Sequence, residues 1–154
     1  MKIEEKIRSM GLDLGDAPVP QANYVPAVRV GDLLFLSGHL PRQRDGSMLN
    51  PGKVEGEVSI QQGYAAARQT AVNCLATVKA IVGDLSKVKK VVKLTVLVNS
   101  DPEFDRHFLV ANGASDLLVE LYGDAGRHAR TTVGVAALPL RSSVEIEMVV
   151  QVGD

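Results

Sequence analysis

Three charged side chains toward the carboxyl end of the chain have the types and spacing to act on a small carboxylate-bearing substrate. Arg130 opens a run in which every second residue is apolar or Thr, and Glu145 and Glu147 alternate with apolar residues in a second run. A planar guanidinium can hold a carboxylate through two parallel hydrogen bonds, and a carboxylate can orient or deprotonate water. These residue types predict an anion clamp and a base that lie close together.

Both runs are typical of β-strands, which determines how the three side chains would lie. The alternate positions are Thr131, Val133, Val135 and Ala137 in the first run, and Val144, Ile146, Met148, Val150 and Val152 in the second. We predict two adjacent strands that carry Arg130, Glu145 and Glu147 on their other faces. Periodicity leaves one alternative open, in which Arg130 and the glutamates only neutralise one another across a solvated sheet.

Length and charge narrow the class of protein. The 154 residues fit one domain with a genuine core, 45% of them are hydrophobic, and the formal net charge is −1. A near-neutral chain has no general attraction for phosphate backbones, so we predict no nucleic-acid partner. The densest basic cluster lacks interleaved aromatic residues and is typical of a solvated strand edge; it consists of Lys87, Lys89, Lys90 and Lys93.

Cysteine, histidine and apolar residues bear on location and cofactors. Cys74 lies in an amphipathic helical pattern, which favours a core position over a nucleophile, and one cysteine allows no internal disulfide. No apolar run approaches the length of a signal sequence or a membrane span, so we expect a cytoplasmic protein without membrane attachment. His39, His107 and His128 lack the spacing of metal ligands, and we expect neither a metal nor another cofactor.

The amino-terminal part of the chain divides into a helix and a connector. A stripe of apolar residues at helical spacing ends at Gly11, and a stretch rich in Gly, Asp and Pro follows it. We assign residues 1–21 to this helix and connector, and residues 22–154 to the domain proper. Two strand-like runs then flank Gly31-Asp32, which predicts a hairpin, and Pro26 places its first strand at an edge. A long polar loop is expected from residue 42 to 58.

Two longer helices are predicted in the middle of the chain. Ser59 and Gln62 fit a capping box, and apolar residues recur at helical spacing from there to Gly83. After an alternating strand at 92–98, Asp101 and Pro102 predict the start of a second helix that would end at Gly123. The order of elements indicates one α+β domain with a mixed sheet and both long helices on one face. The opposite face would be bare and apolar, which predicts a closed homo-oligomer.

Several short motifs, taken in order over residues 22–152, resemble the YjgF/RidA family. They are Tyr24, Leu36-Ser37-Gly38-His39-Leu40-Pro41, the long helix after Ser59, Lys93-Leu-Thr-Val-Leu-Val, Ala129-Arg130 and Val144-Glu145-Ile146-Glu147. The resemblance implies a chorismate-mutase-like α+β fold and a homotrimer with ligand sites between its subunits. The segment 1–21 would mark a branch with an amino-terminal extension.

The resemblance also implies an activity and the residues that perform it. Family members with an arginine at the position of Arg130 hydrolyse reactive enamines and imines of the 2-aminoacrylate type to 2-keto acids and ammonia, without a metal or cofactor. Arg130 would anchor the carboxylate and Glu145 would position the attacking water. The pocket wall would be formed by Tyr24, Ser37, Gly38, Asn112 and Thr132. Glu147 would be structural.

This sequence departs from the family pattern at three positions, and two other functions compete with hydrolysis. Thr132 stands where the best-known deaminases carry Cys, His39 where they carry Gln, and His128 where Pro is common. One alternative is a non-catalytic module that binds a keto acid or related metabolite in the same pocket. The other is ribonuclease activity, which the near-neutral charge and the lack of an aromatic and basic face argue against.

Overall fold

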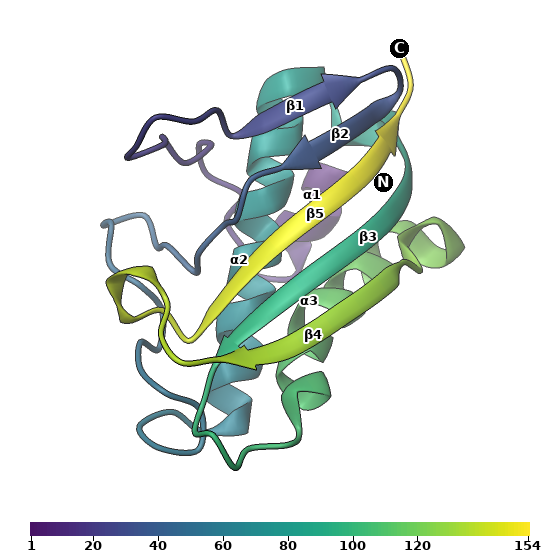
Figure 1. Cartoon of the computed structure of the whole chain (residues 1–154). Helices are drawn as coiled ribbons and strands as arrows, with labels where there is room; N and C mark the ends of the chain where they lie inside the picture. The colour runs from purple at the N-terminus through teal and green to yellow at the C-terminus, as the bar shows by residue number, and fades with distance from the viewer.

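The computed structural model describes all 154 residues as one sheet with helices on one side (Figure 1). The helices are α1 (Ile3–Ser9), α2 (Ile60–Val82) and α3 (His107–Tyr122), and short 3-10 turns follow at Leu85–Lys87, Gly123–Gly126 and Pro139–Arg141. The strands are β1 (Ala27–Val30), β2 (Leu33–Leu36), β3 (Val88–Asn99), β4 (Ala129–Val135) and β5 (Val144–Val152). The predicted α+β mixed sheet is confirmed.

The spatial order of the strands is β1-β2-β5-β3-β4, and only the β3–β4 pair is parallel. The predicted adjacency of the last two strands is therefore wrong, because β3 lies between β4 and β5. Alternate residues of β5 are fully buried, whereas no residue of β4 is. The more apolar strand thus occupies the interior of the sheet, and β4, which contains Thr and Gly, forms an edge. The predicted hairpin is confirmed, with Val30 opposite Leu33 and β1 at the other edge.

Helix α2 begins as its sequence predicts, but α3 does not. The Ser59 hydroxyl accepts from the Gln62 backbone N–H at 3.1 Å, and the Gln62 side-chain oxygen accepts from the Ser59 backbone N–H at 2.9 Å. The predicted start of α3 at Asp101 is wrong, because α3 begins at His107. The Asp101 carboxylate accepts from Glu103 N–H and its carbonyl from Phe104 N–H, which makes a separate turn before the helix.

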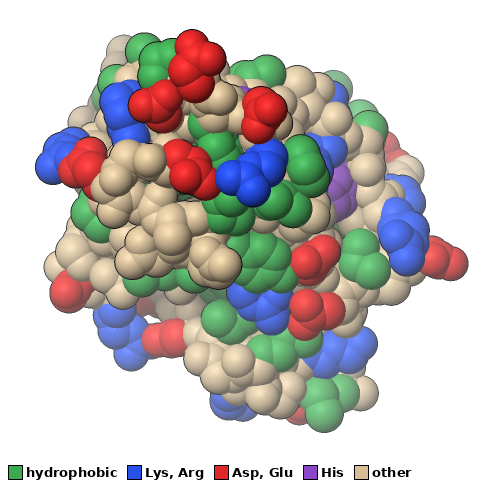
Figure 2. Space-filling view, turned by 90° about the horizontal axis from the view of Figure 1, so that it is seen from below, with side chains coloured by type: hydrophobic (Ala, Val, Ile, Leu, Met, Phe, Trp, Pro, Cys, Tyr) green, Lys and Arg blue, Asp and Glu red, His purple; other side chains and the backbone are tan.

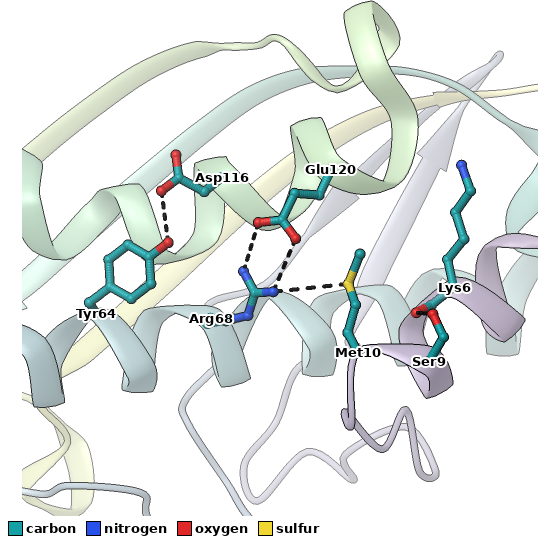
Figure 3. A network of polar contacts seen from close by, with 7 residues as sticks. All are labelled: Lys6, Ser9, Met10, Tyr64, Arg68, Asp116 and Glu120. Carbon is teal, nitrogen blue, oxygen red and sulfur yellow. Dashed lines mark hydrogen bonds and ion pairs between the residues drawn. The ribbon is translucent and has the colours of Figure 1, made fainter.

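Helices α2 and α3 lie against each other over one face of the sheet and are joined by polar contacts (Figure 3). The Tyr64 hydroxyl donates to Asp116 at 2.7 Å, and Arg68 donates to both carboxylate oxygens of Glu120 at 3.3 and 3.2 Å. Arg68 also contacts the sulfur of Met10 at 3.9 Å, which links the turn after α1 to this pair. These bonds hold α3 at a fixed position relative to α2.

One glycine allows the two helices to approach closely. A Cβ atom at Gly113 would lie 2.0 Å from the backbone oxygen of Tyr64, which no side chain tolerates. The residue therefore sits where the α3 backbone meets the α2 backbone. Cys74 of α2 is fully buried, as predicted, and burial raises the pKa of its thiol. It packs within the hydrophobic cluster that also includes Ile7 of α1.

The sheet face opposite the helices exposes apolar side chains, which the sequence predicts. Phe35, Val28 and Val30 are 46%, 51% and 61% exposed, and Val133 is 44% exposed on the far edge. At the end of the molecule where β4 stops and β5 starts, apolar side chains lie between acidic and basic ones (Figure 2). None of the three helices combines the length and apolarity that crossing a membrane requires.

Candidate active site

Glu145 lies in a cavity on the bare side of the sheet. In the antiparallel register it is opposite Leu97, and its neighbours Val144 and Ile146 point to the helices. The cavity has a volume of about 570 Å³, and its lining includes Tyr24, Ser37, Gly38, Leu140 and Glu145. Four of the sequence-predicted site residues are therefore brought together here: Tyr24, Ser37, Gly38 and Glu145.

The lining residues have different uses. A Cβ atom at Gly38 would lie 2.9 Å from the carboxyl carbon of Glu145, so glycine leaves room for that carboxylate against the backbone. The Ser37 hydroxyl donates to Val25 O at 2.7 Å and so holds the segment that carries Tyr24. Tyr24 is half-exposed at the cavity wall. Glycine at position 38 and the anchored Ser37 thus shape the space around Glu145.

Burial raises the pKa of the half-buried Glu145 carboxyl, and the neighbouring charge of Glu147 raises it further. A carboxylate with a raised pKa is a stronger base than an ordinary surface glutamate. It therefore removes a proton from water more readily near neutral pH. Glu147 is exposed, and its charge acts on Glu145.

Arg130 lies on β4 and points to α3 rather than to the bare face. Its Nη1 atom donates to Asn112 Oδ1 and to Ser115 Oγ, each at 2.9 Å. Two bonds use both hydrogens of Nη1, and the edge formed by Nε and Nη2 has no protein partner. Burial lowers the pKa of Arg130 from its high ordinary value, with the charge of Asp116 opposing this, and an arginine remains a cation at neutral pH. The free edge is a bidentate carboxylate site.

Thr132 follows Arg130 on the same face of β4. Its hydroxyl donates to Val96 O at 3.0 Å, so the side chain is held against β3. Asn112 and Thr132 therefore lie with Arg130, and the other three predicted site residues, Tyr24, Ser37 and Gly38, lie with Glu145. The sequence did not point to Ser115, although its spacing of three from Asn112 places both on one face of a helix.

The two groups of site residues occupy opposite faces of the sheet within one chain. Arg130 is opposite Leu94 in the register, and Leu94 is buried under the helices, whereas Glu145 is opposite Leu97 on the other face. None of the ion pairs includes Arg130, Glu145 or Glu147. The alternative in which Arg130 and the glutamates neutralise one another is therefore wrong for this chain, and so is their predicted closeness.

The histidines are used in separate parts of the fold. His39 is buried, bonded to Ser37 O and to the Thr77 hydroxyl at 2.7 Å each, and burial lowers its pKa. His128 bonds Gly126 O and Ser115, and the His107 ring packs edge-on to Phe104. The loop 42–58 is tied to the site region as well, because Gly52 N–H donates to Arg141 O at 2.7 Å and Glu57 pairs with Arg141.

Comparison with known proteins agrees with this fold. Residues 4–152 match the family described as "YjgF/chorismate mutase-like, putative endoribonuclease". The chain belongs to the YjgF/RidA family. Its chorismate-mutase-like fold follows from that membership and from the sheet described above.

Relatives of this YjgF/RidA protein carry different names. Protein TCP17 of Trypanosoma cruzi is 40% identical over 99% of this chain and 96% of its own length. A protein of Dermatophagoides farinae named 2-iminobutanoate/2-iminopropanoate deaminase is 30% identical over 87% of this chain and 89% of its own. The crystal structure of a protein of unknown function from Agrobacterium tumefaciens, Atu1372, is 44% identical with a TM-score of 0.92, covering 98% of this chain and 92% of that one. The relatives therefore include a protein named as an imine deaminase, but family membership alone does not specify the activity of this chain.

Proposed function

We propose that this protein hydrolyses enamines and imines of the 2-aminoacrylate type to 2-keto acids and ammonia. The observation that carries the proposal is the guanidinium of Arg130, whose Nη1 is held by two bonds while its Nε–Nη2 edge is free for a carboxylate. A half-buried glutamate with a raised pKa supplies the base that water addition needs. The deaminase name of one relative supports the same chemistry.

We further propose that the working form is a homotrimer with each site between two subunits. Arg130 and Glu145 lie on opposite faces of one sheet, so a single chain presents only half of the machinery to any one substrate. The exposed apolar side chains on the Glu145 face are the surface that a second copy would cover. In the trimer, the Arg130 half of one chain, with Asn112 and Thr132, meets the Tyr24, Ser37, Gly38 and Glu145 half of the next.

The reaction divides between the two halves. Arg130 holds the substrate carboxylate and thereby fixes the imine carbon beside Glu145. Glu145 takes a proton from water as the water oxygen bonds to that carbon, and the C=N electrons move to nitrogen. Glu145 passes that proton to nitrogen, which gives a carbinolamine. Glu145 then carries the hydroxyl proton to nitrogen as the C=O bond of the keto acid forms and the C–N bond breaks to release ammonia. No other reactant is required.

The proposal is tested by generating an imine in the assay from an amino acid with an amino-acid oxidase and following keto-acid release. We expect the protein to accelerate release, and Arg130→Ala to lower kcat/KM by roughly 100-fold or more, since a charge-assisted bidentate contact is lost. Ser86→Ala is the control, because Ser86 is exposed and lies in the turn before β3 rather than on β4 or α3. Equal rates with and without the protein would contradict hydrolysis, and keto-acid binding without acceleration would favour the binding module instead.

Replacing Glu147 with Gln is expected to move the acid limb of the pH–activity profile to lower pH. The charge of Glu147 raises the pKa of Glu145, so a neutral amide lets Glu145 lose its proton at a lower pH. Because the base must be deprotonated to act, kcat/KM then persists further into acid. The measurement is kcat/KM against pH for both proteins, and an unmoved acid limb would show that another group sets it.

A further inference from the structure

A chain of hydrogen bonds runs from the backbone before β4 to the guanidinium of Arg130. His128 Nδ1 lies 2.7 Å from Gly126 O, and His128 Nε2 lies 2.8 Å from Ser115 Oγ. Ser115 Oγ in turn accepts from Arg130 Nη1 at 2.9 Å. The resemblance to other family members gives no role to Ser115 or His128.

The direction of each bond follows from its atoms. The Gly126 carbonyl can only accept, so His128 Nδ1 carries a hydrogen, and burial lowers the pKa of His128, which keeps the ring neutral at pH 7. Nε2 therefore has no hydrogen and accepts the Ser115 O–H. The hydroxyl hydrogen is committed to His128, and a lone pair of Ser115 faces Arg130.

We propose that Ser115 and His128 are positioning residues that present the Nε–Nη2 edge of Arg130 to the substrate carboxylate. This inference rests on the proposed role of Arg130 as the anchor. Asn112 alone would hold one hydrogen of Nη1 and leave the guanidinium free to swing about that bond, whereas Ser115 holds the second and fixes its plane. Without His128, the Ser115 hydroxyl is free to turn to the carbonyl four residues back in α3, which moves its oxygen.

The pair also explains how the guanidinium is kept in place without a carboxylate bonded to it. Arg130 contacts neutral Asn112 and Ser115 rather than a carboxylate, and no ion pair includes it. A bound protein carboxylate would compete with the substrate for the free edge. Neutral acceptors orient the guanidinium and leave its charge for the ligand.

The test compares the dissociation constant for 2-oxobutanoate in wild type, Ser115→Ala, His128→Leu and the double variant. We expect each single variant to bind about tenfold more weakly, and the double variant little more weakly than either, because both act through one contact. His128→Gln, whose side-chain oxygen can accept the Ser115 hydroxyl, is expected to restore affinity to within about threefold of wild type. Melting temperatures close to wild type confirm that each variant folds.

Three results would overturn the inference. One is wild-type affinity in Ser115→Ala and His128→Leu while Arg130→Ala loses binding. Arg130 would then still be the anchor, but it would not depend on Ser115 and His128 for its position. Another is a double variant whose loss is the product of the two single losses, since the residues would then act separately. The third is failure of His128→Gln to restore binding. Unchanged binding in Arg130→Ala would instead contradict the proposed anchor itself.

Discussion

Arg130→Ala and Glu145→Gln are each expected to lack activity alone, yet to recover roughly a quarter of the wild-type rate when equal amounts assemble together. A site between subunits takes Arg130 from one chain and Glu145 from the next. In a randomly mixed ring, one interface in about four joins an intact Arg130 to an intact Glu145. The rate of keto-acid release measures the recovery after co-expression or joint refolding.

The expected loss in each single variant follows from its role. Glu145→Gln cannot accept the proton of water, and removal of a general base lowers rates by roughly 10²–10⁴-fold. Arg130→Ala leaves the substrate carboxylate unbound. Mixing the folded proteins without subunit exchange is the control, and it should remain inactive. If co-assembled variants also remain inactive, both residues serve one site within a single chain, and the arrangement between subunits fails.

Gly113→Ala is expected to destabilise the protein by about 3 kcal/mol or more, and so to lower the melting temperature by roughly 6–12 °C. The added Cβ would lie 2.0 Å from Tyr64 O and 2.8 Å from Tyr64 C, both backbone atoms that cannot move without separating α2 from α3. Asn112 and Ser115 on α3 would shift with it, so ligand affinity should fall as well. Thermal unfolding monitored by circular dichroism measures the change.

Gly63→Ala on α2 is the matched control. Comparing its change in the free energy of unfolding with that of Gly113→Ala separates the effect of backbone packing from that of helix propensity. The atoms nearest to its Cβ would be methyl groups of Val110 and Val54, at 3.2 to 3.3 Å, so that only side chains, and no backbone, would have to shift by a few tenths of an ångström. Alanine favours a helix over glycine by about 1 kcal/mol, which offsets the cost of that shift, so this variant should lose far less stability than Gly113→Ala. If Gly113→Ala were equally stable, the helices would have room that the structure denies them.

Local signals in the sequence predicted the elements that depend on neighbouring residues. The capping box at Ser59, the turn at Gly31-Asp32 and the alternation in β5 each involve residues close in the chain, and each prediction is confirmed. The predicted start of α3 was wrong because Asp101 forms a separate turn. Its N–H also donates to Val54 O, which belongs to a distant segment of the chain. Gly113 gave only a weak helix-breaking signal, although its purpose is a backbone contact with α2.

The candidate site was predicted residue by residue but not in its geometry. Motifs identified Arg130 and Glu145, but β4 turns Arg130 toward α3 and leaves Val133 exposed on the bare face, which is the reverse of the facing that its alternation predicts. Alternation within one strand cannot show which strand lies next to it. Ser115 carried no motif, and only its distance to Arg130 and His128 reveals its use.

The opposite facing of Arg130 and Glu145 has a consequence for how much activity a cell obtains from this chain. In the proposed trimer, a newly made copy holds both residues but would complete no site until neighbours join it. Output per copy therefore depends on abundance: at low expression most copies would be idle, and a modest increase in synthesis would raise total turnover more than proportionally. Gene dosage, rather than any change in the site, would then set the working capacity.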